Sequence, residues 1–391
     1  MKKHLFLLAV GLFLVSATAF SQGKFSGYMF GDYYYNVARD SSFNHTAPGA
    51  AASSSSAPGS TSMQAFQIRR IYLTYDNDIS DIFTSRFRLE ADQGATPGVT
   101  APVANTTSGA ITSADELPSG KTSVFVKDAY LMWKNVFAGS NLIFGVQPTP
   151  AYDVYETAWS YRFLEKTIMD LRSIVPSRDL GMSLKGNLVG NGMVNYWLMI
   201  GNDDGNIPEN NKYKRYYAHI QLKPMTNFLA TVYVDYKDAA DVKNASGSLV
   251  SASTMTEAVF VNYAVPFMYN FGVELFMNSA SNAFTPKGGT LGSKDALGFT
   301  VYGAYNLIPE LAIVARYDNY DPNTNSAVNA KGDSRNYIIA GLSWKADKNV
   351  SISPNILYET YETPVNVVTG ANGAAINASV TARLTFYYVF L

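Results

Sequence analysis

Two arginines, two residues apart, lie in the stretch IFTSRFRLEAD, residues 82–92. Successive side chains of an extended chain point to opposite sides, so Arg86 and Arg88 share one face while Phe87 and Leu89 share the other. A soluble sheet turns its apolar face inward and its charges to bulk water. Arginines that instead line a wet interior favour small anions, because they replace part of the lost hydration. The chemistry of these residues therefore depends on which face of the strand is buried.

The same alternation of apolar and polar side chains recurs along the chain. It holds throughout RDLGMSLKG (178–186), RYYAHIQLK (215–223) and VTARLTFYYVF (380–390). In FQIRRIYLTYD (66–76) it holds only in the second half. There are about sixteen such segments, each near the roughly ten residues that a tilted strand needs to cross a bilayer.

Two kinds of connection separate these segments. Short links rich in Asn, Asp, Gly and Pro, as in tight turns, lie at Asn77–Ser80, Asn135–Gly139, Asn187–Asn191, Lys223–Asn227, Val265–Tyr269, Asn306–Glu310 and Ala346–Asn349. Long links alternate with them and include Asp40–Ser62, Gln93–Gly120, Pro148–Ser177, Asp238–Ser253 and Glu362–Ala375. This alternation is typical of a barrel with short periplasmic turns and long extracellular loops. The sequence predicts an all-β fold, a transmembrane antiparallel up-and-down β-barrel of about 16 strands that forms one domain over residues 23–391.

Composition narrows the function classes. Charged residues make up 16% and aromatic residues 14% of the 391 residues, and the net charge is −1. Charged residues run near a quarter in soluble proteins, and no basic surface for nucleic acid is indicated. The chain has no cysteine, which excludes disulfides and thiolate metal sites. No metal cluster, phosphate loop or nucleotide fingerprint is present, so we expect no cofactor.

The N-terminus has the pattern of a secretory signal peptide over residues 1–22. Lys2 and Lys3 precede an apolar run, and Ala17-Thr18-Ala19 forms a small-residue cleavage site. Cleavage is expected after Ala19 or after Gln22. The apolar run is too short for a membrane anchor. We therefore expect export to the bacterial outer membrane, with its lipids as partners.

The charged faces of the strands should point into the barrel. Arginine on the lipid face costs about 2–4 kcal/mol at the bilayer midplane, and a charged interior must hold water. By this rule the inward residues are Arg70, Arg86, Arg88, Arg215, Arg316, Arg335 and Arg383, with Asp76, Glu90, Asp128, Asp179, Asp318 and Glu359. Aromatic girdles at the two interfaces are predicted from Tyr33–Tyr35, Trp133, Trp197, Trp344 and Tyr387–Tyr388.

Several motifs resemble the phosphate-selective porin O and P family of outer-membrane channels. They are FQIRRIYLTYDNDISDIFTSRFRLEAD, VFVKDAYLMWKNVFAGSNLIFGVQPTP, FLEKTIMDLRSIVPSRDLGMSLKG and GLSWKADKNVSISPNILYE. The resemblance implies a sixteen-stranded barrel, usually trimeric, that passes small anions such as phosphate through an arginine-lined lumen. Arg70, Arg86, Arg88 and Arg178 lie within the matching motifs. Two departures are the inward carboxylates, which nearly balance the arginines, and the end YYVFL, in which Phe390 is penultimate.

The link Pro148–Ser177 differs from the other long links. It contains a helix-compatible run from Glu156 to Leu171, with Tyr161, Leu164, Ile168 and Leu171 at helical spacing. It is the third long link, which porins fold into the lumen. If it folds inward, Arg162, Lys166 and Arg172 bring positive charge to the constriction. The alternative is a helix over the barrel mouth with solvated charges.

The leading hypothesis is an outer-membrane porin, a water-filled diffusion channel for small hydrophilic solutes with some preference for phosphate-like anions. The alternatives are a general non-selective porin and a structural or adhesion barrel without significant conductance. An enzyme is not expected, because catalysis needs a base beside a nucleophile or an activated water. His4 leaves with the signal peptide, His45 lies in the first long link, and His219 has no evident Ser or Asp partner. A homotrimer is expected from the resemblance alone.

Overall fold

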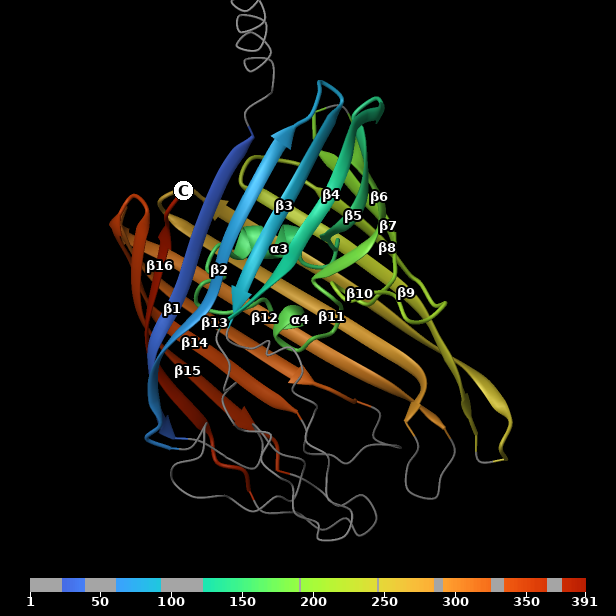
Figure 1. Ribbon diagram of the computed structural model, residues 1–391. Coiled ribbons are helices and arrows are strands. Elements are labelled where there is room, and N and C mark those ends of the chain that lie inside the picture. The colour runs from blue at the N-terminus through green and yellow to red at the C-terminus, as the bar shows by residue number, and fades with distance from the viewer. Residues whose placement is uncertain are drawn as a thin grey trace, which may run out of the picture.

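The computed structural model describes residues 23–38, 61–92, 122–189, 191–244, 246–284, 291–324, 334–363 and 375–391. Strands β1 to β16 form one closed antiparallel barrel, in which each strand pairs with its neighbours in sequence and β1 closes on β16 (Figure 1). The predicted barrel fold is confirmed. The predicted signal peptide and most of the long links at 40–62, 93–120 and 362–375 lie outside the described residues.

The elements follow one another with two short helices between β5 and β6. The strands are β1 Lys24–Ala38, β2 Gln64–Asp78, β3 Phe83–Asp92, β4 Ser123–Phe137, β5 Ser140–Pro148, β6 Arg178–Val189, β7 Val194–Gly201, β8 Arg215–Leu222, β9 Phe228–Lys243, β10 Leu249–Val265, β11 Tyr269–Phe284, β12 Gly292–Ile308, β13 Leu311–Asp321, β14 Arg335–Asp347, β15 Val350–Tyr361 and β16 Ser379–Val389. The helices are α3 Asp153–Trp159 and α4 Ile168–Leu171.

The short links of the sequence are the tight turns of the barrel. For example, β8 ends at Leu222 and β9 begins at Phe228. In the same way, β10 ends at Val265 and β11 begins at Tyr269. The prediction of a long link over 238–253 is wrong. Strands β9 and β10 extend into this range, and their pairing continues to the Lys243–Leu249 pair. Each strand supplies the hydrogen-bond ladder of the other, which outweighs the weak strand propensity of these small and polar residues.

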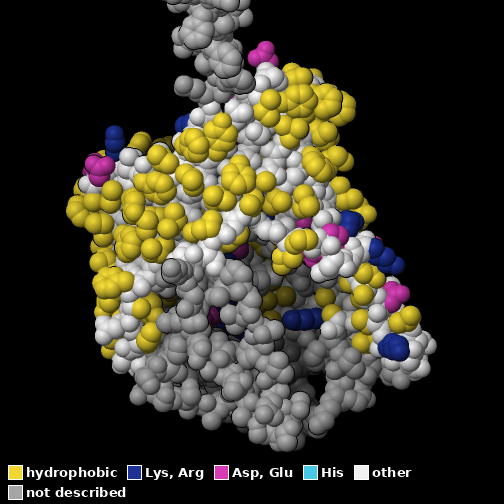
Figure 2. Space-filling view, viewed as in Figure 1, with side chains coloured by type: hydrophobic (Ala, Val, Ile, Leu, Met, Phe, Trp, Pro, Cys, Tyr) yellow, Lys and Arg dark blue, Asp and Glu magenta, His cyan; other side chains and the backbone are white. Residues whose placement is uncertain are grey.

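The outer wall is apolar. Between β10 and β11, Val259 pairs with Leu275 and Val261 with Val273, and these side chains are exposed on the outside. Figure 2 shows hydrophobic side chains over a broad band of the visible outer face, with charged groups toward its margins. Such a band matches the apolar belt of a membrane barrel. Within the described residues, neither helix has the length and hydropathy of a membrane-spanning helix.

A β-bulge explains the broken alternation in residues 66–76. Phe30 pairs with Arg70 and Gly31 with Ile68, so Arg69 is an extra residue in β2. A bulge of this kind re-aims the side chains on either side of it. Arg69 and Arg70 therefore both reach carboxylates of neighbouring strands, Asp32 and Glu90 respectively.

Besides Tyr34, which pairs across the strands with the inward Arg383, two of the predicted girdle aromatics are not on the outer face. Trp197 is only 5% exposed and pairs across the strands with the buried His219, while its neighbour Leu198 is exposed. Tyr387 stacks on Phe163 of the β5–β6 connection, at 5.2 Å between ring centroids. Strand alternation carries both rings to the inner face. Trp133 and Trp344 are exposed, as a girdle requires.

Candidate functional site

The β5–β6 connection lies inside the barrel (Figure 1); we call residues 149–177 the inward segment. It contains α3 and α4 in place of the single helix predicted over 156–171. Helix α3 ends at Trp159, and the C-cap residue Ser160 has a left-handed φ of 63°. Leu164 and Ile168 of the predicted apolar face are fully buried. The spacing therefore identified buried positions without predicting the correct helix bounds.

The apolar face of α3 packs on the wall formed by β10 to β12. Tyr155 lies 4.5 Å from Phe260 between ring centroids, and Trp159 lies 4.8 Å from Tyr302. Tyr155 and Trp159 are both buried, and their spacing of four residues puts them on one side of the helix. The amide of Asn270 donates to the Ala158 carbonyl at 2.7 Å. The inward segment is thus fixed against one side of the barrel.

Wall arginines bind the backbone between the two helices. Arg383 and Arg69 donate to the Leu164 carbonyl at 2.6 and 3.1 Å, and Arg316 donates to the Lys166 carbonyl. Carbonyls inside a continuous helix would bond to backbone N–H groups four residues further on. Because guanidinium groups take these carbonyls, the chain between α3 and α4 need not be helical.

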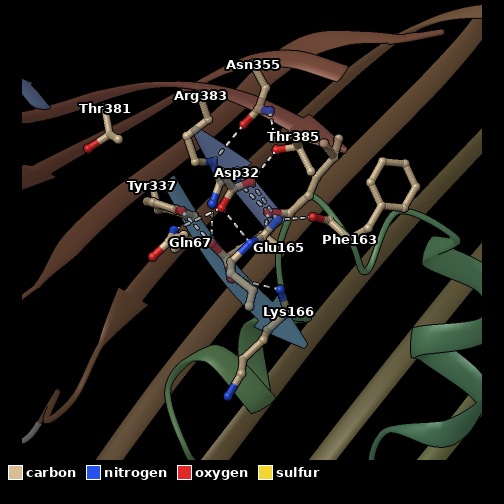
Figure 3. Close-up of polar contacts among 12 residues, drawn as sticks. Asp32, Gln67, Phe163, Glu165, Lys166, Tyr337, Asn355, Thr381, Arg383 and Thr385 are labelled. Atoms are coloured by element: carbon tan, nitrogen blue, oxygen red, sulfur yellow. Dashed lines mark hydrogen bonds and ion pairs between the residues drawn. The ribbon is translucent and has the colours of Figure 1, made fainter. Parts of the chain in front are cut away.

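Glu165 forms the centre of a buried ion-pair cluster (Figure 3). Its carboxylate lies 3.7 Å from Arg383 and accepts a hydrogen bond from the Tyr337 hydroxyl at 3.1 Å. Arg69 also lies 2.7 Å from Asp32 of β1. Burial acts to raise the pKa of Glu165, but Arg383 and Arg69 outweigh it and lower that pKa to about 2.

This pKa predicts how acid affects the inward segment. A carboxyl whose pKa is depressed in the folded state contributes stability above its ordinary pKa and loses it as the pH falls toward the depressed value. Glu165 should therefore keep the segment anchored above about pH 4.5 and release it progressively toward pH 2. We expect open-channel noise to be unchanged from pH 7 to 5 and to rise toward pH 2. The variant Glu165→Gln should be noisy already at pH 7; equal noise in the two proteins at every pH would contradict this role.

Four of the predicted arginines converge on one cavity of about 380 Å³, which we call the arginine cavity. Its charged lining consists of Arg86, Arg88, Arg162 and Arg178, with Asp153 and Glu156. Both acidic residues belong to α3. Guanidinium groups therefore outnumber carboxylates on the surface that a solute would meet.

The guanidiniums of the arginine cavity are ion-paired. Arg88 and Arg178 share the fully buried Asp128 at 3.3 and 2.5 Å, while Arg86 pairs with Asp76 at 2.6 Å. One carboxylate between two guanidiniums leaves a net positive charge at that point. The pairing fixes the arginine side chains, and it also weakens the field that an anion feels.

The remaining predicted site residues lie elsewhere, each beside a carboxylate. Arg70 lies 2.6 Å from Glu90, Lys166 lies 3.5 Å from Asp170, Arg172 lies 2.9 Å from Glu359, Arg215 lies 2.5 Å from Asp235, Arg316 lies 2.5 Å from Asp318, and Arg383 lies 3.7 Å from Glu165. Arg172, Arg316 and Arg383 connect the inward segment to the wall. They therefore position the segment and do not line the arginine cavity.

Three charged residues of this region were not predicted from the sequence. Arg69 is hidden by the bulge, and the broken alternation of residues 66–76 was its signal. Lys127 sits at a second bulge, between the Arg88–Asp128 and Leu89–Val126 pairs, and reaches Glu90 at 2.9 Å. Glu165 had no periodicity to mark it, because its role depends on strands distant in sequence.

A second, larger cavity of about 540 Å³ lies beside α3 toward β5–β10; we call it the amide cavity. Its lining includes Lys185, Trp197, His219 and Gln221. Asp153 and Thr157 of α3 line both cavities, so the two spaces adjoin along one face of the helix. The open part of the barrel interior thus lies on the side that the inward segment does not cover.

His219 forms no hydrogen bond to a hydroxyl or carboxylate group of a described residue, although Asp153 and Thr157 line the same cavity. It is 4% exposed, and its strand neighbours are Trp197 and Tyr233. Neither is a nucleophile that a histidine base commonly activates.

Comparison with known proteins supports the fold. No model of a protein family matches the chain, and no curated protein sequence matches it. The anion-selective porin from Comamonas acidovorans is similar with a TM-score of 0.61 and 11% identity, covering 95% of this chain and 100% of that one. The outer membrane channel DcaP of Acinetobacter baumannii gives 0.61 and 13%, covering 95% and 98%. OmpT of Vibrio cholerae in its trimer form gives 0.56 and 11%, covering 95% and 99%. At these identities the likeness shows a porin-like barrel fold.

Proposed function

We propose that the protein is an outer-membrane porin, a water-filled channel that lets small hydrophilic solutes diffuse through the barrel. The observation that carries the proposal is the pair of adjoining cavities beside α3, inside a closed barrel with an apolar outer belt. Both cavities have polar and charged linings, which must hold water. The inward segment narrows the lumen and directs solutes along the uncovered side.

A preference for small anions follows from the charges on this side. The two cavities together present Arg86, Arg88, Arg162, Arg178, Lys185 and Lys223 against Asp153 and Glu156. Cationic side chains replace part of the hydration that an anion loses on entry. The preference is modest, because carboxylates such as Asp76 and Asp128 form ion pairs with the guanidiniums and neutralise part of their positive charge. Phosphate is one such anion, but this balance favours a broader set of small anions.

The proposal includes a location and an assembly. Residues 1–22 act as a cleaved signal peptide for export to the outer membrane. The homotrimer is supported by the fold likeness to the Vibrio cholerae protein in its trimer form. A structural or adhesion barrel without conductance is the alternative, and a silent but correctly folded barrel in a planar bilayer would favour it.

The reversal potential under a KCl gradient tests the anion preference. We expect the wild type to give a chloride-directed potential, and the double variant Arg88→Gln/Arg178→Gln to lower the chloride-to-potassium permeability ratio by roughly twofold or more. The double change leaves Asp128 without its two guanidiniums. Arg215→Gln serves as the control, because Arg215 lines neither cavity. A potassium-directed wild-type potential would overturn the anion preference and leave a general porin.

A further inference from the structure

A row of polar side chains crosses three strands of the amide cavity. Lys185 of β6 pairs with Trp197 of β7, and Trp197 pairs with His219 of β8. Side chains directly opposite on neighbouring strands share one face of the sheet, and all three line the cavity. The row therefore presents an ammonium, an indole and an imidazole side by side to the same space.

Lys185 differs from the arginines of the arginine cavity because it forms no salt bridge with a described residue; Asp153, which lines the same cavity, acts on it only from beyond salt-bridge distance. No carboxylate of a described residue lies within salt-bridge distance of it, whereas Arg86, Arg88 and Arg178 each have one. Its ammonium lies 4.3 Å from the Trp197 ring centroid, a cation–π contact. That contact holds the side chain in place without neutralising its charge. Lys185 is thus available to pair with an anionic group of a solute.

Two hydrogen-bonding groups beside Lys185 are also unused within the described part of the chain. The indole nitrogen of Trp197 is buried and has no acceptor, and His219, which lines the cavity, makes no hydrogen bond to a described residue. Buried polar groups of native proteins nearly always have a partner. Trp197 donates only, and neutral His219 can donate through one ring nitrogen. An acceptor-rich group placed against this row would satisfy both together with Lys185.

Amide side chains on the rest of the lining suit hydroxyl groups. Gln221 and Asn141 accept hydrogen bonds through their carbonyl oxygens, and no described residue accepts from their NH₂ groups. Asn262 donates through its NH₂ group to its neighbours, and no described residue donates to its carbonyl oxygen. A hydroxyl both donates and accepts, so it can use either kind of site.

We infer that the amide cavity is a binding subsite for a small hydroxylated monocarboxylate, with the carboxylate on Lys185, Trp197 and His219. The cavity volume of about 540 Å³ falls within the range for small organic ligands. Asp153 also lines the cavity, which disfavours a dianion such as phosphate. The inference rests on the proposed channel, since the solute reaches the cavity through the lumen, and it names one solute class for that channel.

Calorimetric titration of the folded protein in detergent tests the subsite without requiring conduction. The probes are gluconate, which has the carboxylate and the hydroxyls, with glucose, acetate and inorganic phosphate as comparisons. We expect gluconate to bind with a dissociation constant at least about tenfold lower than each of the other three. Phosphate or glucose binding as tightly as gluconate would overturn the assignment.

Substitutions at Lys185 and Trp197 test whether gluconate binds at the row of polar side chains. Lys185→Gln should raise the dissociation constant for gluconate about tenfold, and Trp197→Phe, which keeps the ring but removes its N–H group, should raise it severalfold. Lys345→Gln, the same loss of charge outside both cavities, should leave it unchanged. Unchanged binding in folded Lys185→Gln or Trp197→Phe protein would overturn the inference. KCl conductance of the same preparations separates the two claims, because a silent protein that binds gluconate contradicts only the channel.

Discussion

Excising the inward segment is expected to raise the single-channel conductance in KCl by about two- to threefold, because pore width governs the passage of small ions. The segment can be removed cleanly, since the Thr149 N–H donates to the Ser177 carbonyl at 3.3 Å and its two ends already meet. Replacing residues 150–176 by a short Gly/Ser turn should therefore leave the strand pairing of β5 with β6 intact. That pairing runs from Ser140–Gly186 to Pro148–Arg178.

Two controls define this result. Deleting residues 210–212, an exposed stretch of the β7–β8 connection, should leave the conductance at the wild-type value. Heat-modifiable mobility on gels should show that both deletion proteins form closed barrels. A folded segment-deletion variant with wild-type conductance would mean that the segment does not narrow the conducting path.

Replacing Arg383 by methionine is expected to free the inward segment while leaving it in the chain. Arg383 is 8% exposed and binds Glu165, the Leu164 carbonyl and Asn355. Removing one partner of a buried ion pair typically costs about 3–5 kcal/mol, because the other charge is left unpaired. We expect a lower Tm and large current fluctuations in planar bilayers.

Arg215→Met is the matched control for this change. Arg215 is equally buried in a different ion-pair cluster, with Asp235 and Asp203, and contacts no residue of the inward segment in any hydrogen bond or ion pair of the described residues. Its loss should lower the Tm by a comparable amount and leave the current steady. Steady currents in the Arg383 variant as well would show that the segment is held by other contacts, such as the packing of Trp159 on Tyr302.

The barrel could be predicted because it depends on local rules. Alternating side chains and short polar turns gave the bounds of β8 and β16 to within one residue at each end. The extended ends of β9 and β10 were missed, because only their mutual pairing stabilises them. Trp197 was predicted to lie in a girdle, although its strand partner, His219, alternates onto the same face as Arg215, which was predicted to point inward. Because paired residues of neighbouring strands share one face of the sheet, Trp197 faces inward as His219 does.

The site was harder to predict because long-range contacts form it. Sequence spacing identified Arg86 and Arg88 as one face of a strand, but it could not show that Asp128 lies between Arg88 and Arg178. The predicted helix over 156–171 is interrupted, and arginines from β2, β13 and β16 bind carbonyls within that stretch that a continuous helix would bond to its own backbone. Such contacts depend on strand register across the whole barrel.

The central claim, that solutes pass beside α3 on its uncovered side, is best tested at Thr157. This residue lines both cavities, and the chain has no cysteine, so Thr157→Cys introduces a unique thiol. Attaching a bulky thiol-reactive group during a single-channel recording should reduce the current in one step, while the cysteine-free wild type is unaffected. A full-sized current after labelling that mass spectrometry verifies would contradict this route through the barrel.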